Sequence, residues 1–129
     1  MPTRALSTDT PIHELKAELF KALGHPVRVR LLELLVPGER AVSDLLAETG
    51  LEASHLSQHL AVLRRTRVVV AHREGNGVRY RLADPSITAL LAAARAFLVS
   101  TLSGTRAALT DLEQQIEQAS STTTGEDHR

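Results

Sequence analysis

The sequence predicts a mainly α-helical domain with one small β-hairpin. Apolar residues recur at helical spacing along much of the chain. One stretch, RVVVAHREGNGVRYRLA, is instead β-branched and alternating, with a turn signal in its middle. The only aromatic residues are Phe20, Tyr80 and Phe97, so the core must be aliphatic, which favours helix packing. At 129 residues the chain has the length of one ordinary domain.

The first helix is expected over residues 12–23, IHELKAELFKAL. Its apolar residues share one side at helical spacing: Ile12, Leu15, Leu19, Phe20 and Leu23. Gly24 ends this helix, and Pro26 starts the second where a missing N–H costs no hydrogen bond. The second helix directs three residues toward a core and stops before the turn Pro37-Gly38. These three are Leu31, Leu34 and Leu35.

Two short helices are expected next. The segment SDLLAETG has Ser43 as its expected N-cap and Gly50 as its C-terminal stop. After a few residues, EASHLSQHLAVLRR begins a fourth helix. Two short helices joined by a tight, glycine-containing turn describe a helix-turn-helix.

A two-stranded ribbon is expected from RVVVAHR and VRYRLA, with Asn76-Gly77 as the hairpin turn. In the second strand Val78, Tyr80 and Leu82 alternate with arginines, which gives the ribbon an arginine face. Because a lone hairpin is only marginally stable, this one is expected to pack against the helices that precede it.

A long last helix is expected to begin at Asp84, as N-cap, and Pro85. Its apolar positions are Ile87, Leu90, Leu91, Ala94, Leu98, Leu102, Leu109, Leu112 and Ile116. Gly104 lies within this pattern and could kink or break the helix. A small core cannot cover so long a stripe, so part of it is expected to meet a second copy of the chain. We expect a flexible N-terminal arm at 1–11, one domain at 12–119 and a disordered polar tail at 120–129.

Composition excludes several classes of protein. The chain has no cysteine, so disulfides, thiolate metal sites and thiol redox switches are excluded. It shows no signal peptide and no stretch approaching the roughly 20 apolar residues of a membrane span, so a cytoplasmic location without membrane contact is expected. An enzyme is not expected, because there is no cysteine nucleophile, glycine-rich phosphate loop or paired acid cluster.

The charges are unevenly spread although the net charge is zero. From residue 53 to residue 82 there are six arginines and a single acidic residue, Glu74. From residue 104 onward there are two arginines and five acidic residues. A basic block of this kind is typical of a surface that binds a polyanion, although exposed arginines also serve solubility alone.

The fourth helix has two distinct sides. At 100° per residue, Leu56, Leu60 and Leu63 define a buried side. The opposite side carries Ser54, Gln58, Ala61 and Arg65. Gln can read adenine, Ser can hold a phosphate and Ala leaves room for a thymine methyl, so this side suits a major groove. A plain solvated face would more often carry Glu and Lys in helical pairs.

The motif HLSQHL places His55 and His59 one helical turn apart, the spacing of a two-histidine metal site. Such a site needs further ligands, and Asp44, Glu48 and His72 have no diagnostic spacing to the pair. We therefore predict no metal site here and no cofactor. For His59 the alternative is a half-buried imidazole hydrogen-bonded to backbone.

The chain resembles the ArsR/SmtB family of bacterial winged-helix repressors over almost its whole length. The matching segments are FKALGHPVRVRLLELL, VSDLLAETGLEASHLSQHLAVLRR and VVVAHREGNGVRYRLAD. The resemblance implies a winged helix-turn-helix of order α-α-α-α-β-β-α and a homodimer joined through the first and last helices. It also implies contacts with double-stranded DNA from Ser54, His55, Ser57, Gln58 and His59 on the recognition helix. Arg65 is expected to join them, because it lies on the outward side of the same helix. In the wing, the resemblance assigns contacts to Arg73, Asn76, Gly77 and Arg79.

The chain departs from this family at the usual sensing sites. Thiolate sensors of the family carry Cys-x-Cys in the third helix, where this chain has Ala41 and Ser43. The family's other site uses Asp, His and Glu on the last helix, where SITALLAAARAF offers no such ligand. The remaining candidate ligands are scattered: His13, Glu14, His72, Glu126, Asp127 and His128.

The leading functional hypothesis is a homodimeric, sequence-specific repressor that binds a palindromic promoter operator. One alternative is a winged-helix protein-interaction module that acts with a partner protein. Another is a metal-responsive repressor with non-standard ligands that binds a divalent metal weakly. A small organic effector is also compatible with the sequence.

Overall fold

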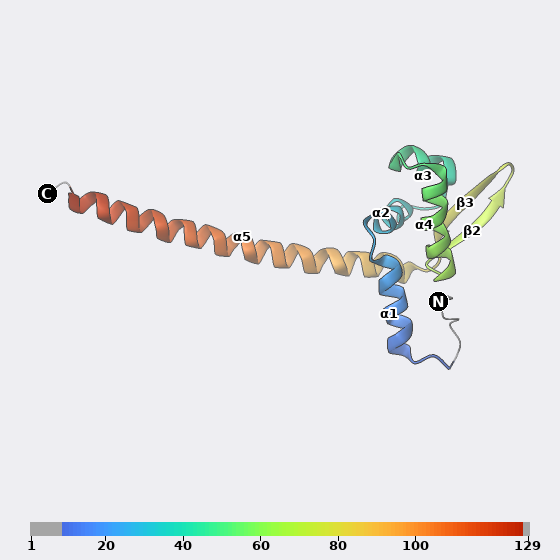
Figure 1. Cartoon of the computed structure of the whole chain (residues 1–129), viewed down its shortest axis with the longest axis horizontal. Coiled ribbons are helices and arrows are strands. Elements are labelled where there is room, and N and C mark those ends of the chain that lie inside the picture. Colours follow the sequence, from blue (N-terminus) through green and yellow to red (C-terminus); the bar gives the residue numbers. More distant parts are fainter. Residues whose placement is uncertain (1–8, 128–129) are drawn as a thin grey trace. The chain divides into compact units, whose positions relative to one another are not determined.

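The computed structural model describes residues 9–127, with side chains described as far as residue 121 (Figure 1). Its helices are α1 (Ile12–Leu23), α2 (Pro26–Leu35), α3 (Val42–Thr49), α4 (Ala53–Arg65) and α5 (Pro85–Asp127). Its strands are β1 (Arg40–Ala41), β2 (Val69–Glu74) and β3 (Gly77–Leu82). Most of the expected N-terminal arm, residues 1–8, and the end of the expected tail, 128–129, lie outside the described residues.

The chain divides into two units, residues 1–89 and 90–129. The first unit holds α1 to α4 and the sheet, and the second is the rest of α5. The predicted class, mainly helical with a small β-hairpin in a winged helix-turn-helix arrangement, is confirmed for the first unit.

The first two helices lie where their patterns place them. Pro26 occupies the first turn of α2, and the side chain of His25 caps this helix by accepting from the Val27 N–H at 3.1 Å. This bond satisfies one of the N–H groups that have no partner within the helix. Leu31 and Leu35 are buried as expected, and so is Leu32. Leu34 is only half-buried.

The start of α3 differs from the prediction. Ser43 is not the N-cap, because the helix already begins at Val42 and Ala41 occupies the cap position. The Ala41 N–H donates instead to Oδ2 of Asp44 at 3.3 Å, so a carboxylate one turn ahead closes this end. The predicted stop at Gly50 is confirmed, since its φ of 69° is the left-handed conformation that glycine adopts without a steric penalty.

The sheet has three strands in the order β1-β3-β2, all antiparallel. Strand β1 was not expected, because two residues are too few to show a pattern; Arg40 pairs with Tyr80 and Ala41 with Arg79. The hairpin turn also differs: Glu74 pairs with Gly77, so Gly75 and Asn76 form the loop in place of Asn76-Gly77. Gly75 has a φ of 59°, which suits the first position of a tight hairpin turn.

The core of the first unit is aliphatic, as expected. The largest fully buried side chains are Leu31, Leu32, Leu35, Leu45, Leu56, Leu63, Val68 and Val69. They come from α2, α3, α4, the residue before β2 and the first residue of β2, so the helix-turn-helix and the hairpin share one core. On α1, in contrast, Ile12 is 65% exposed and Phe20 is 57% exposed. Part of the apolar stripe of α1 therefore remains uncovered within one chain.

Helix α5 runs without a break from Pro85 to Asp127 and passes through Gly104. It extends beyond residue 119, where we expected the ordered part to end. Oδ2 of Asp84 accepts from the Ser86 N–H at 2.8 Å and from the Ser86 hydroxyl, which supports the predicted start. These two hydrogen bonds lower the pKa of Asp84.

The expectation that no segment approaches a membrane span needs correction. Pro85–Ser121 is long and apolar enough to cross a membrane by length and composition, with a mean hydropathy of 1.5 over its most apolar 18 residues. One such helix is weak evidence for a membrane, because the apolar helix of a protein interface has the same composition.

We predict that Leu63→Ala lowers the free energy of unfolding by about 2–5 kcal/mol, because it opens a cavity in the shared core. Leu63 is 0% exposed. Val36→Ala, at a position that is 41% exposed, is the control and should change this free energy by less than about 1 kcal/mol. Urea unfolding followed by circular dichroism measures both. Equal losses in the two variants would contradict this assignment of the core.

Candidate nucleic-acid interface

The exposed side of α4 is the first part of the candidate interface. Leu56, Leu60 and Leu63 are buried, as predicted, so the opposite side of the helix faces solvent. The predicted outward residues Ser54, Gln58, Ala61 and Arg65 are exposed, as are His55 and Ser57. The helix therefore presents hydrogen-bonding side chains and an arginine on one surface, supported from behind by leucines.

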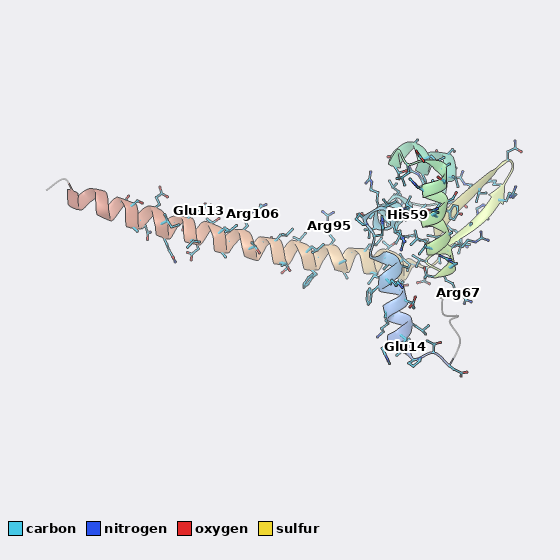
Figure 2. All side chains as sticks on the ribbon, viewed as in Figure 1. Glu14, His59, Arg67, Arg95, Arg106 and Glu113 are labelled. Carbon is cyan, nitrogen blue, oxygen red and sulfur yellow. The ribbon has the colours of Figure 1, made fainter. Side chains whose placement is uncertain are left out.

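His59 lies at the edge of this surface and is half-buried (Figure 2). Its Nδ1 accepts a hydrogen bond from Nε of Arg28 at 3.3 Å, and its ring centroid is 4.5 Å from that of His25. Arg28 also donates to the carbonyl oxygen of Ala22 at 3.2 Å. The partner of His59 is thus a side chain of α2 rather than the backbone. This contact joins α4 to α2.

The environment of His59 favours its neutral form. Burial lowers the pKa of His59 first, and the nearby His25, Arg28 and His55 lower it further. Only the neutral ring leaves Nδ1 a lone pair that can accept from Arg28. The hydrogen bond and the lowered pKa therefore support each other.

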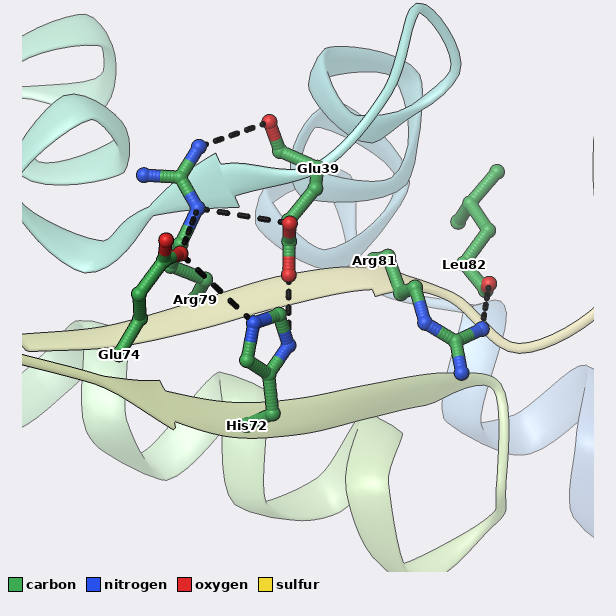
Figure 3. A network of polar contacts seen from close by, with 6 residues as sticks. All are labelled: Glu39, His72, Glu74, Arg79, Arg81 and Leu82. Carbon is green, nitrogen blue, oxygen red and sulfur yellow. Dashed lines mark hydrogen bonds and ion pairs between the residues drawn. The ribbon is translucent and has the colours of Figure 1, made fainter.

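The wing supplies the second part of the candidate interface. Arg73, Asn76 and Gly77 are exposed at its end, where the resemblance places DNA contacts. Arg79 is different, because a network of polar contacts holds its guanidinium group (Figure 3). Its Nε lies 3.5 Å from Oε2 of Glu39 and 3.4 Å from Oε2 of Glu74, and its Nη2 donates to the Glu39 carbonyl oxygen at 3.5 Å.

His72 joins the same network. Its Nδ1 lies 2.6 Å from Oε1 of Glu39, and its Nε2 lies 3.8 Å from Oε2 of Glu74 (Figure 3). Glu39 precedes β1, whereas His72 and Arg79 pair with each other across β2 and β3. The network therefore ties the wing to the strand that leads into α3. Sequence analysis missed Glu39 because only the pairing of β1 with β3 brings it beside the wing.

The network is also the one group of three potential metal ligands among the side chains that the structure describes. One ligand atom each from Glu39, His72 and Glu74 lies within 4.8 Å of the others. Arg79 forms ion pairs with both carboxylates, so a cation would have to compete with its guanidinium group. His55 and His59 do not belong to such a group. The side chains of Glu126, Asp127 and His128 lie outside the described residues.

The arginines of the basic block lie on the surface around these two parts. Those at positions 64, 65, 67, 73 and 81 are exposed. Arg67, labelled in Figure 2, has a φ of 61° in the turn between α4 and β2. Its N–H donates to the carbonyl oxygen of Arg64 at 3.0 Å. The surface that surrounds α4 and the wing is therefore rich in positive charge, which favours a polyanion.

Comparisons with known proteins agree with this arrangement. Residues 25–70 match the family described as bacterial regulatory proteins of the arsR family. The chain is 53% identical over 103 residues to Rv0081, an uncharacterised HTH-type transcriptional regulator of Mycobacterium tuberculosis, across 79% of this chain and 90% of the relative. The crystal structure of Rv0081 matches with a TM-score of 0.68 over 74% of this chain and 96% of that chain.

Two further solved structures are similar. A homodimeric winged helix-turn-helix DNA-binding domain from Mycobacterium bovis is 31% identical, with a TM-score of 0.64 over 74% of this chain and 90% of that chain. The transcriptional repressor BigR from Xylella fastidiosa is 35% identical, with a TM-score of 0.62 over 66% of this chain and 87% of that chain.

We predict that the protein loses stability as the pH falls through about 6.5, the ordinary pKa of histidine, toward the lowered pKa of His59 in the folded chain. In that window the unfolded chain binds a proton at His59 and the folded chain does not, so the stability present at higher pH is lost. Urea unfolding at about pH 7.5 and about pH 5.5 measures the difference. It should shrink in His59→Gln and persist in the control His13→Gln; an unchanged difference in His59→Gln would contradict the assignment.

Proposed function

Because the chain belongs to the ArsR family of winged helix-turn-helix transcriptional regulators, we propose that it is a homodimeric repressor of a palindromic promoter operator. As a member of this family it is a DNA-binding transcriptional regulator and not an enzyme, as predicted from the sequence. The proposal adds the direction of regulation, the form of the operator and the assembly of this chain. A cytoplasmic location follows from this role.

One observation carries the proposal: the exposed side of α4, with Ser54, Gln58 and Arg65, lies opposite its buried leucines. In this role, α4 enters the major groove and Gln58 reads a base edge, with adenine as its best partner. Ser54 and Ser57 hold phosphates at the ends of the contact. The end of the wing, with Arg73 and Asn76, lies along the neighbouring backbone or minor groove.

Uncovered apolar side chains support the homodimer. Ile12 and Phe20 on α1 are exposed, and so is Phe97, at 70%, on α5. A second copy that covers them removes apolar surface from water, which is worth about 25 cal/mol per Å². A twofold axis then places two recognition helices in successive major grooves, about 34 Å apart. A bound dimer covers promoter DNA and so blocks transcription; the similar protein BigR is a transcriptional repressor.

A metal-responsive repressor is the second candidate function, and the group formed by Glu39, His72 and Glu74 favours it. A divalent ion held there would displace Arg79 from the carboxylates and change how the wing lies against β1. Titrating nickel, zinc and cobalt against the protein–DNA complex tests this function. Unchanged DNA affinity with all three metals would remove it.

We predict that Gln58→Ala weakens binding to a selected operator roughly 10-fold or more but leaves binding to random DNA nearly unchanged. The reason is that the variant loses a contact with a base but keeps every contact with phosphate. The operator comes from selection of bound genomic fragments. Gln114→Ala, an exposed glutamine on α5, is the matched control. Equal losses of affinity on both DNAs would argue against base reading. If the protein alone selected no fragment and needed an added partner protein to do so, the protein-interaction alternative would be favoured.

We predict that Arg73 and Arg79 differ in their contributions to DNA binding. Arg73 is exposed and forms no ion pair with the residues that the structure describes, whereas two carboxylates hold Arg79. Arg73→Gln should weaken binding to both DNAs and reduce the slope of log K against log salt by about 1.8, because a homodimer loses two phosphate contacts at about 0.9 each. Arg79→Gln should leave this slope within error of the parent chain. A larger change in slope for Arg79→Gln would mean that its guanidinium group leaves the network to bind phosphate.

A further inference from the structure

The distal part of α5, residues 98–119, carries an apolar stripe with a period different from that of a free helix. Leucine, isoleucine or a small residue recurs at alternating steps of four and three residues. The positions are Leu98, Leu102, Thr105, Leu109, Leu112, Ile116 and Ala119. Such steps average 3.5 residues, the period of a left-handed coiled coil. We call this set the distal seam.

The large apolar side chains of the distal seam have no cover within the described chain. Its leucines and Ile116 are between 51% and 66% exposed. A lipid bilayer is a poor cover, because Arg106, Asp111, Glu113 and Glu117 lie on the other sides of the same segment. A narrow seam flanked by charged residues is instead the surface that a second helix covers.

The sizes of the seam residues favour an antiparallel second copy. If Leu109 packs opposite Leu112 of the second copy, Thr105 meets Ile116 and Leu102 meets Ala119. Each small residue then faces a large one, which fills the layers evenly. In a parallel pair, Thr105 would face Thr105 and Ala119 would face Ala119, which leaves underfilled layers.

The flanking charges favour the same orientation. Arg106 and Glu113 lie seven residues apart beside the seam, so they share one flank of α5 (Figure 2). In the antiparallel register Arg106 of each copy lies beside Glu113 of the other, which makes two symmetric pairs of opposite charge. In a parallel pair they would lie beside the uncharged Thr101 and Ala108. Flanking charges of this kind set the orientation of coiled coils.

We propose that residues 102–119 form an antiparallel coiled coil with the same residues of a second copy of this chain, with Leu109 opposite Leu112. The midpoint of this register lies between residues 110 and 111, so the two copies of residue 97 are about 40 Å apart at 1.5 Å per residue. This contact therefore differs from the proposed dimer contact through α1 and the proximal part of α5. It joins two such dimers into a tetramer and goes beyond the proposed repressor function.

Single cysteines in the full-length protein test the register, because the chain has no cysteine of its own. Leu102→Cys and Ala119→Cys are made separately, then oxidised alone and as an equal mixture. The antiparallel register predicts a disulfide-linked dimer in the mixture, between one chain of each variant, and little in either variant alone. A parallel pair would crosslink each variant alone, and such a result would overturn the proposal.

Charge reversal provides the second readout, since it keeps the seam intact. Arg106→Glu or Glu113→Arg alone should raise the dissociation constant of the tetramer roughly tenfold, measured by sedimentation at low salt. The double variant should restore it. Arg95→Glu, outside the seam segment, is the control, and circular dichroism confirms that the helix is retained. Unchanged dissociation in both single variants would overturn the assigned register.

The assembly state separates this proposal from the proposed function. A tetramer with the mixed crosslink supports both. A dimer with the mixed crosslink supports the distal seam and contradicts the dimer through α1. A dimer without this crosslink overturns the proposed coiled coil. Binding of α5 to phosphatidylcholine vesicles in place of self-association also overturns it. Neither result bears on operator binding, which is measured separately by a footprint on DNA.

Discussion

The burial of one side of α4 is the constraint on which the rest of the structure depends. Leu56, Leu60 and Leu63 are almost fully removed from water, and α4 packs against both α2 and β2. Because a helix turns by a fixed angle per residue, burying this side also determines which residues face outward. The hydrophobic core thus determines the side of the helix on which Gln58 and Arg65 lie. The packing of the leucines on one side of α4 therefore determines that the side suited to DNA faces solvent.

Polar contacts then refine this orientation at two places. The hydrogen bond from Arg28 to His59 joins α4 to α2, and the group around Glu39 joins the wing to β1. Both use residues that composition alone would assign to DNA or to metal. In this fold Arg79 forms ion pairs with Glu39 and Glu74, and His59 accepts a hydrogen bond from Arg28. The count of basic residues therefore overstates the charge that is free to meet phosphate.

Helix α5 follows a different principle, because nothing in the described chain covers its distal stripe. Leu109 and Ile116 remain more than half exposed. Exposed apolar surface on this scale needs a partner, and a period of 3.5 residues selects another helix over a flat surface or a bilayer. The joining of two dimers into a tetramer would then depend on the second unit of the chain, and the reading of DNA on the first.

Local patterns determined most of the fold. Helical spacing placed α1, α2 and α4, and alternation placed the hairpin, because each signal lies within a few neighbouring residues. The outward side of α4 followed as well, since it depends only on helix geometry. Contacts between distant segments were decided by the tertiary structure alone. The pairing of β1 with β3 brings Glu39 to Arg79, and the packing of α2 on α4 brings Arg28 to His59. No local spacing encodes such contacts, because they form only when segments about 30 to 40 residues apart are packed together.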